Sequence, residues 1–111
     1  MSGGNKVAVI GAGAWGTALA IQATRAAEAA GQEVVLWARE PARALSIDSL
    51  RENARHLPGL PLPPALAVTG DARAALAGAS LAILAVPTQH LGAVLKGLEE
   101  LPPCVVVAKG V

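Results

Sequence analysis

The sequence predicts an α/β fold built on a doubly wound parallel sheet, with helices on both faces of that sheet. Five short apolar runs recur along the 111 residues, and none of them alternates cleanly with polar residues. Such runs are typical of strands that are covered on both faces. Helical segments separate them, which indicates right-handed crossovers and a three-layer architecture. The expected strands are Val7–Ile10, Val34–Trp37, Ala67–Thr69, Leu81–Val86 and Val105–Ala108.

Four helices are expected between these strands. The first is rich in alanine, contains no proline and ends before Gly31, a residue that suits a helix C-terminus. The second has Pro41 in its first turn and keeps Leu45 and Leu50 roughly on one side. Asp71 is a suitable N-cap for the third. The expected helices are Trp15–Ala30, Pro41–Arg51, Asp71–Ala77 and a fourth from Thr88 or Gln89 to about Leu98.

The segment Leu57–Pro64 separates the second helix from the third strand. It holds four prolines and a glycine in eight residues, so it can neither continue a helix nor donate to a central strand. Because Leu57, Leu60 and Leu62 interleave the prolines, we predict an ordered loop rather than a linker.

Composition excludes several classes of protein. Hydrophobic residues make up 53% and charged residues 15%, against about 25% charged in an average domain, which excludes intrinsic disorder. The longest apolar run, Leu81–Val86, is much shorter than the roughly 18 residues that a membrane span needs. The net charge is +1 without a basic run, so neither nucleic acid nor an anionic membrane surface is an expected partner.

The cysteine content and the N-terminus bear on the compartment. The N-terminal residues do not form a secretory signal, and the single cysteine, Cys104, cannot form an intramolecular disulfide. Both observations favour the cytoplasm. We expect Cys104 to lie in a buried strand and to act as a small hydrophobic residue.

A glycine pattern, Gly-x-Gly-x-x-Gly, lies between the first strand and the first helix. Gly11 permits a tight turn, Gly13 leaves room for a pyrophosphate, and Gly16 lets the helix pack closely on the strand. The helix N-terminus adds unpaired N–H groups and a partial positive charge. Trp15 can flank the cofactor or cover the mouth of the sheet. The pattern predicts a Rossmann-type dinucleotide-binding domain, and the alternative is a purely structural glycine turn.

The residues after the second strand bear on the choice of cofactor. An acidic residue at this place accepts hydrogen bonds from the ribose 2′-hydroxyl and repels a 2′-phosphate. Here Arg39 occupies it, and a guanidinium can pair with a 2′-phosphate, so NADP(H) is favoured and NAD(H) tolerated. Two alternatives stay open: Arg39 is a solvated cation, or Glu40 points at the ribose and reverses the preference.

Further candidates follow the fourth and fifth strands, because ligands of parallel sheets bind beyond the carboxyl ends of the strands. His90 can wall the nicotinamide side of the cleft or lie on a helix surface. Lys109 directly follows an apolar strand, where a cation can bind an anionic substrate or orient a carbonyl group. His56 is interpreted as structural.

With these residues in hand, the sequence resembles the N-terminal domain of the bacterial NAD(P)-dependent glycerol-3-phosphate dehydrogenases. The ordered set of motifs, which covers nearly the whole chain, is much more specific than the glycine turn alone. The matching pieces are Gly11–Ala20, Leu36–Arg39, Asn53–Gly59 (Asn-Ala-Arg-His-Leu-Pro-Gly), Ala85–Gln89 and Val107–Gly110.

The resemblance implies reversible hydride transfer between NAD(P)H and dihydroxyacetone phosphate, which gives sn-glycerol 3-phosphate for phospholipid synthesis. It implies cofactor contacts at Ala14, Trp15 and Arg39, and contact with both cofactor and substrate at Lys109. His90 stands where the family often has another large residue. The general acid/base of the family is a lysine in a helical C-terminal domain, which also holds most ligands of the substrate phosphate.

We therefore expect residues 1–111 to be the NAD(P)-binding domain of a larger two-domain enzyme, truncated before its C-terminal domain and inactive alone. The alternatives are a related hydroxyacid-type dehydrogenase or ketopantoate reductase, and a non-catalytic dinucleotide-binding sensor. The Asn53–Gly59 stretch argues against the first of these. Oligomeric state is left open, with a homodimer of the full-length enzyme as one alternative.

Overall fold

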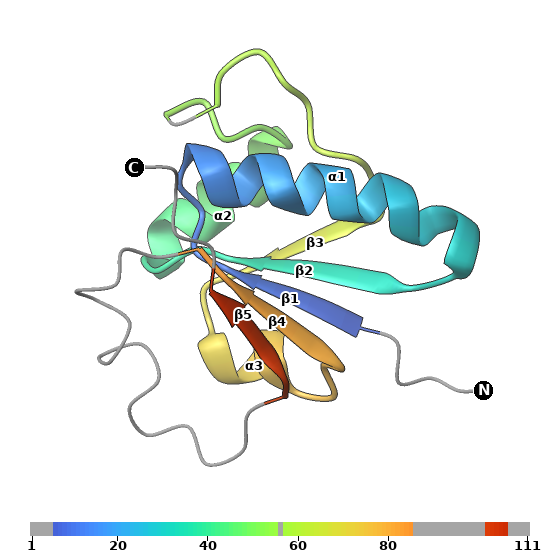
Figure 1. The fold of residues 1–111 in the computed structure, drawn as a ribbon. Coiled ribbons are helices and arrows are strands. Elements are labelled where there is room, and N and C mark those ends of the chain that lie inside the picture. Colours follow the sequence, from blue (N-terminus) through green and yellow to red (C-terminus); the bar gives the residue numbers. More distant parts are fainter. Residues whose placement is uncertain (1–5, 56, 86–101, 107–111) are drawn as a thin grey trace.

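Five parallel strands form one sheet whose spatial order, β3-β2-β1-β4-β5, differs from their order along the chain (Figure 1). This computed structural model describes residues 6–55, 57–85 and 102–106. All five expected strands are present, and the three whose expected ends are both described begin one residue earlier than expected and end as expected. They are β1 (Lys6–Ile10), β2 (Glu33–Trp37), β3 (Leu66–Thr69), β4 (Leu81–Leu84) and β5 (Cys104–Val106).

Helices cover both faces of the sheet, which confirms the three-layer α/β prediction. The described helices are α1 (Ala14–Ala30), α2 (Pro41–Leu50) and α3 (Ala72–Leu76). Figure 1 shows α1 and α2 on one face and α3 on the other. Asp71 caps α3 as expected, because its side chain accepts hydrogen bonds from the backbone N–H groups of Arg73 and Ala74. The expected helix 88–98 lies outside the described residues.

Successive residues of the central strands enter two separate cores. Val9 packs towards α1 and α2, whereas Ala8 and Ile10 pack towards α3. All three are fully buried, so the apolar runs without polar alternation reflect burial on both faces. Alanines of α1 such as Ala20 and Ala27 complete the first core and, being small, let the helix approach the sheet closely.

Two expectations about individual side chains need correction or refinement. Cys104 is exposed, not buried, because β5 is an edge strand that pairs only with β4 among the described residues. Leu45 and Leu50 of α2 are also exposed. The α2 residues that face the core are Ala44 and Ile47.

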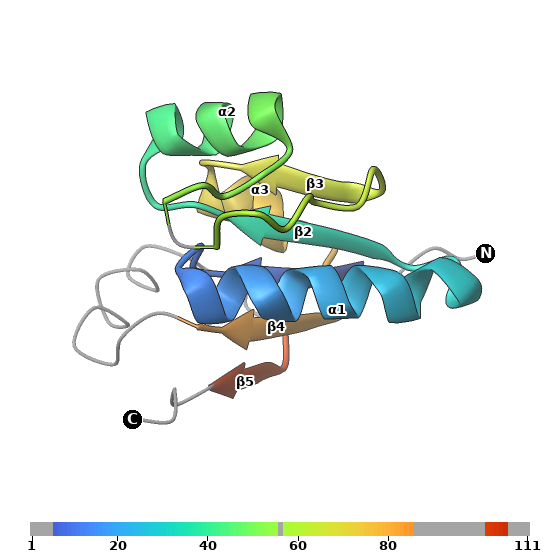
Figure 2. The same cartoon turned by 90° about the horizontal axis from the view of Figure 1, so that it is seen from above.

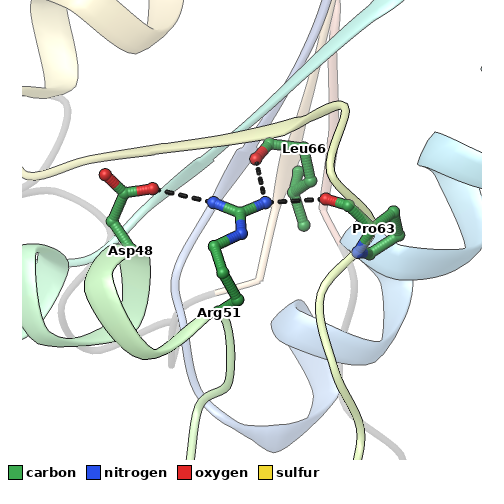
Figure 3. Close-up of polar contacts among 4 residues, drawn as sticks. All are labelled: Asp48, Arg51, Pro63 and Leu66. Carbon is green, nitrogen blue, oxygen red and sulfur yellow. Dashed lines mark hydrogen bonds and ion pairs between the residues drawn. The ribbon is translucent and has the colours of Figure 1, made fainter.

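The proline-rich segment is an ordered loop, as expected, with Leu62 buried and Leu57 partly buried against the first core. Arg51 closes its base: one guanidinium nitrogen donates to the carbonyl oxygens of Pro63 (2.6 Å) and Leu66 (2.7 Å), and another binds Asp48 (Figure 3). Figure 2, which looks down on α1 and α2, shows this loop crossing the space between the two helices.

No helix in the described ranges is long and apolar enough to cross a membrane.

Candidate functional site

The glycine turn lies where the ends of three strands meet. The order of the sheet places β2 on one side of β1 and β4 on the other, so the direction in which successive strands are added to the sheet reverses at β1. The N–H of Gly11 donates to the carbonyl oxygen of Trp37 at the end of β2 (3.1 Å), and the N–H of Ala85, after β4, donates to Ile10 (2.8 Å). Crevices at such topological switch points are the usual ligand sites of open α/β sheets.

Two glycines shape the turn in the ways that the sequence predicts. Gly11 has a φ of 124°, a conformation that side chains disfavour. At Gly16 a Cβ atom would collide with the carbonyl oxygen of Gly11 and would lie 3.2 Å from the Cβ of Ala85. The first turn of α1 therefore packs directly against the ends of β1 and β4.

The N-terminus of α1 is open to a ligand. The first backbone bond of the helix runs from the N–H of Thr17 to the carbonyl oxygen of Gly13 (2.9 Å), so the preceding N–H groups have no partner within the helix. Ala14 is exposed, Trp15 is 49% exposed, and a Cβ atom at Gly13 would meet nothing within 4 Å. Open space, unpaired donors and the positive end of the helix dipole together suit a phosphate.

Asn53 joins the site, a role that its place in the Asn53–Gly59 motif does not by itself predict. Its side-chain amide is buried and donates to the carbonyl oxygen of Ala12 (2.7 Å) and to the hydroxyl of Thr17 (2.8 Å). One feature of the sequence could have indicated this role. Asn53 shares a short segment with interleaved leucines, and an amide that is buried with them needs polar partners.

After β2, Arg39 and Glu40, the two candidates for contact with the ribose of the cofactor, have different surroundings. Arg39 is exposed and makes no hydrogen bond or ion pair with the described part of the chain. The carboxylate of Glu40 pairs with the guanidinium of Arg43 (3.3 Å). A cleft of about 410 Å³ extends between α2 and residues 52–55, with Glu40, Arg43 and Asn53 in its lining.

The structure thus brings together Gly11, Gly13, Ala14, Trp15 and Gly16, with Arg39 following the neighbouring strand. The remaining candidates, His90 and Lys109, and the histidine interpreted as structural, His56, lie outside the described residues. Where the structure describes side chains, no three His, Cys, Asp or Glu residues gather as metal ligands.

Comparison with known proteins agrees with this geometry. The family model described as "NAD-dependent glycerol-3-phosphate dehydrogenase N-terminus" matches residues 6–111. A glycerol-3-phosphate dehydrogenase [NAD(P)+] of Deinococcus radiodurans is 46% identical over 99% of this chain, and one of Variovorax paradoxus is 49% identical over 96%. The chain covers 32% and 31% of these relatives, so it spans about a third of their length.

Solved structures show the same relationship. The crystal structure of glycerol-3-phosphate dehydrogenase from Coxiella burnetii matches 96% of this chain with a TM-score of 0.81 and 32% identity. The Plasmodium falciparum glycerol-3-phosphate dehydrogenase matches 97% with a TM-score of 0.83 and 27% identity. The chain covers 33% of each of those chains. From its sequence, its sheet order and its glycine turn, the chain belongs to the family of NAD-dependent glycerol-3-phosphate dehydrogenase N-terminal domains.

Proposed function

We propose that residues 1–111 form the NAD(P)-binding domain of a glycerol-3-phosphate dehydrogenase. Together with a substrate domain, this enzyme would transfer a hydride reversibly between NAD(P)H and dihydroxyacetone phosphate, giving sn-glycerol 3-phosphate. The observation that carries the proposal is the open glycine turn at the switch point between β1 and β4. The names of the relatives support the substrate and the reaction.

The role of this chain is to hold and orient the dinucleotide. The N–H groups of Ala14 and Trp15 bind the pyrophosphate, and the absence of a side chain at Gly13 lets it approach. The half-exposed ring of Trp15 flanks the bound cofactor. When bound, the nicotinamide supplies the hydride chemistry, and the protein contributes position and electrostatics.

Two further contacts stand on the sequence and the family resemblance. Lys109 contacts both cofactor and substrate, where its charge suits the phosphorylated substrate, and His90 walls the nicotinamide side. The general acid/base lysine belongs to the C-terminal domain in this family. A cytoplasmic location and a homodimeric full-length enzyme stay predictions.

We propose that NADP(H) is favoured and NAD(H) accepted. Arg39 is exposed and uncommitted within the described residues, so its guanidinium is available to a 2′-phosphate. The competing hypothesis needs the carboxylate of Glu40 at the ribose, but that carboxylate is engaged by Arg43. Glu40 is itself exposed, so this surface pair is weak, and NAD(H) is still accepted.

The charge reversal Arg39→Asp tests this preference. We expect NADPH affinity to fall about tenfold or more, since a charge-assisted hydrogen bond contributes roughly 1.5–3 kcal/mol, while NADH affinity changes little. Arg25→Asp is the matched control, because Arg25 is exposed on α1 more than two turns from the glycine turn. Equal losses for both cofactors would contradict the 2′-phosphate role.

A second experiment tests the division of labour between domains. We expect the 111-residue chain alone to bind NADPH without oxidising it when dihydroxyacetone phosphate is added, because the family's proton-transferring lysine lies in the other domain. The measurement is NADPH absorbance at saturating substrate. Turnover by this chain alone would show that catalysis does not need a second domain.

A further inference from the structure

The strongest unexplained feature is the buried amide of Asn53, which reaches the glycine turn from a different part of the chain. Asn53 lies 41 residues after Ala12 and is 1% exposed. A carboxamide nitrogen carries two protons, and here one binds the carbonyl oxygen of Ala12 and the other the hydroxyl of Thr17. Both donors are therefore committed to the two ends of the phosphate-binding segment.

The bond to Ala12 sets the direction of a peptide group inside the turn. In a planar trans peptide, the carbonyl of Ala12 and the N–H of Gly13 point in opposite directions, and the described residues contain no cis peptide. Because Asn53 holds the carbonyl towards the loop, the N–H of Gly13 is directed away from it. If this peptide rotated, a carbonyl oxygen would turn towards the site and repel a phosphate.

The bond to Thr17 fixes the first turn of α1. The N–H of Thr17 already donates to Gly13, and its buried hydroxyl accepts from Asn53. The segment between these two anchors contains Ala14 and Trp15, whose N–H groups are the proposed pyrophosphate donors. A donor set held in place before binding loses less entropy when the ligand arrives.

Asn53 is itself held by its own loop. The backbone carbonyl oxygen of Asn53 accepts from the N–H of Leu57 (2.7 Å). The carboxylate of Glu52 accepts from the N–H of Gly59 (3.0 Å), and the backbone carbonyl oxygen of Arg51 accepts from the N–H of Leu62 (2.8 Å). Several hydrogen bonds therefore hold the loop that carries Asn53, so the side-chain amide of Asn53 can support the glycine turn rigidly.

We propose that Asn53 is a positioning residue for dinucleotide binding, which orients the Ala12–Gly13 peptide and the first turn of α1 towards the pyrophosphate. This inference rests on the proposed function, because it assigns Asn53 to the same phosphate site. The proposal makes the loop after α2 part of the cofactor site, through the contact of the Asn53 amide with Ala12 and Thr17.

The test compares a ligand that has a pyrophosphate with one that lacks it. In Asn53→Asp, a carboxylate of nearly the same shape cannot donate to Ala12 when ionised. We expect NADPH affinity to fall about tenfold or more, because an acceptor then faces an acceptor. Adenosine 2′-monophosphate carries the adenosine end without the pyrophosphate, so its affinity should stay within about threefold, or 0.65 kcal/mol.

Thr24→Val is the matched control for general damage to α1. Thr24 is also buried on this helix, and its hydroxyl donates to the carbonyl oxygen of Ala20 (2.7 Å), remote from the turn. We expect this variant to melt at a lower temperature and to bind NADPH as the wild type does. Thr17→Val removes one of the two acceptors of the Asn53 amide. We expect its NADPH affinity to lie between that of the wild type and that of Asn53→Asp.

The outcomes separate this inference from the proposed function. If the wild-type chain binds neither NADPH nor NADH, the proposed function is overturned and this inference with it. If the wild type binds and both Asn53→Asp and Thr17→Val retain its affinity, only the positioning role is overturned. Equal losses for NADPH and adenosine 2′-monophosphate also overturn it, since they indicate a general structural role. If Asn53→Asp does not fold, Thr17→Val decides by the same comparison.

Discussion

Gly16 packs so closely against Gly11 that a Cβ atom at Gly16 would collide with the Gly11 carbonyl oxygen. The hypothetical Cβ would also lie 3.0 Å from the carbonyl carbon of Gly11. These obstacles are backbone atoms of a turn that is hydrogen-bonded to β2, so they cannot move aside as a side-chain end can. The contact joins α1, whose N-terminus is the proposed phosphate site, to the end of β1.

Gly16→Ala should therefore destabilise the fold. The methyl group forces α1 away from the ends of β1 and β4, and we expect a loss of roughly 3 kcal/mol, at the upper end of the cost of overpacking. Chemical denaturation followed by circular dichroism measures this loss. A variant as stable as the wild type would contradict the close packing of α1.

Gly13→Ala should leave the stability of the fold nearly unchanged and weaken cofactor binding instead. A Cβ atom there meets nothing within 4 Å, so we expect a stability within about 1 kcal/mol of the wild type. The added methyl would occupy the space through which a pyrophosphate approaches, and NADPH affinity should fall about tenfold or more, a cost of about 1.4 kcal/mol. Calorimetric titration of the folded variant measures the affinity, and unchanged binding would place the pyrophosphate elsewhere.

Arg51 allows a separate test of the loop that carries Asn53. Arg51→Ala removes the donors to Pro63 and Leu66, and we expect a loss of about 2–3 kcal/mol in denaturation experiments. Arg51 has a φ of 53°, so Arg51→Gly should recover about 1 kcal/mol of that loss.

Asp48→Asn is the control for the ion pair of Arg51. Because the side chain of Asp48 is 53% exposed, this substitution should cost less than about 1 kcal/mol. If Asp48→Asn costs as much as Arg51→Ala, the ion pair rather than the carbonyl contacts holds the loop.

Asp71→Ala tests the cap of α3. Its carboxylate accepts from the N–H of Arg73 (3.0 Å) and, less closely, from that of Ala74 (3.4 Å), so the substitution should cost about 1 kcal/mol. Asp71→Ser should retain most of the stability, because serine also caps helices. Hydrogen exchange of the α3 amides measures the effect, and identical protection in both variants would show that the cap contributes nothing.

Most of the elements could be predicted because their signals are local. The run from Val7 to Ile10 is apolar without interruption, and the structure buries β1 between helices on both faces. Gly31 has a φ of 70° directly after α1, as expected of a glycine that ends a helix. The roles of Gly11 and Gly16 follow similarly, since a glycine pattern between a strand and a helix has few physical explanations.

Exposure of single side chains was less predictable. Cys104 lies in an apolar run that reads as a buried strand, and its exposure follows from the place of β5 at the edge of the described sheet. On α2, the buried residues Ala44 and Ile47 are separated by one turn, and Leu45 between them is exposed. Hydrophobicity alone does not say which face of a short helix meets the sheet.

The sequence by itself determined the fold class, the glycine turn and the family, because strand and helix periodicity and glycine spacing are properties of neighbouring residues. Only the tertiary structure decided the strand order and the contact of Asn53 with Ala12 and Thr17. That contact joins residues 36 and 41 positions apart, and it exists because the loop after α2 folds back over the start of α1. The partner of a buried polar group depends on how distant elements pack, and no local pattern contains that information.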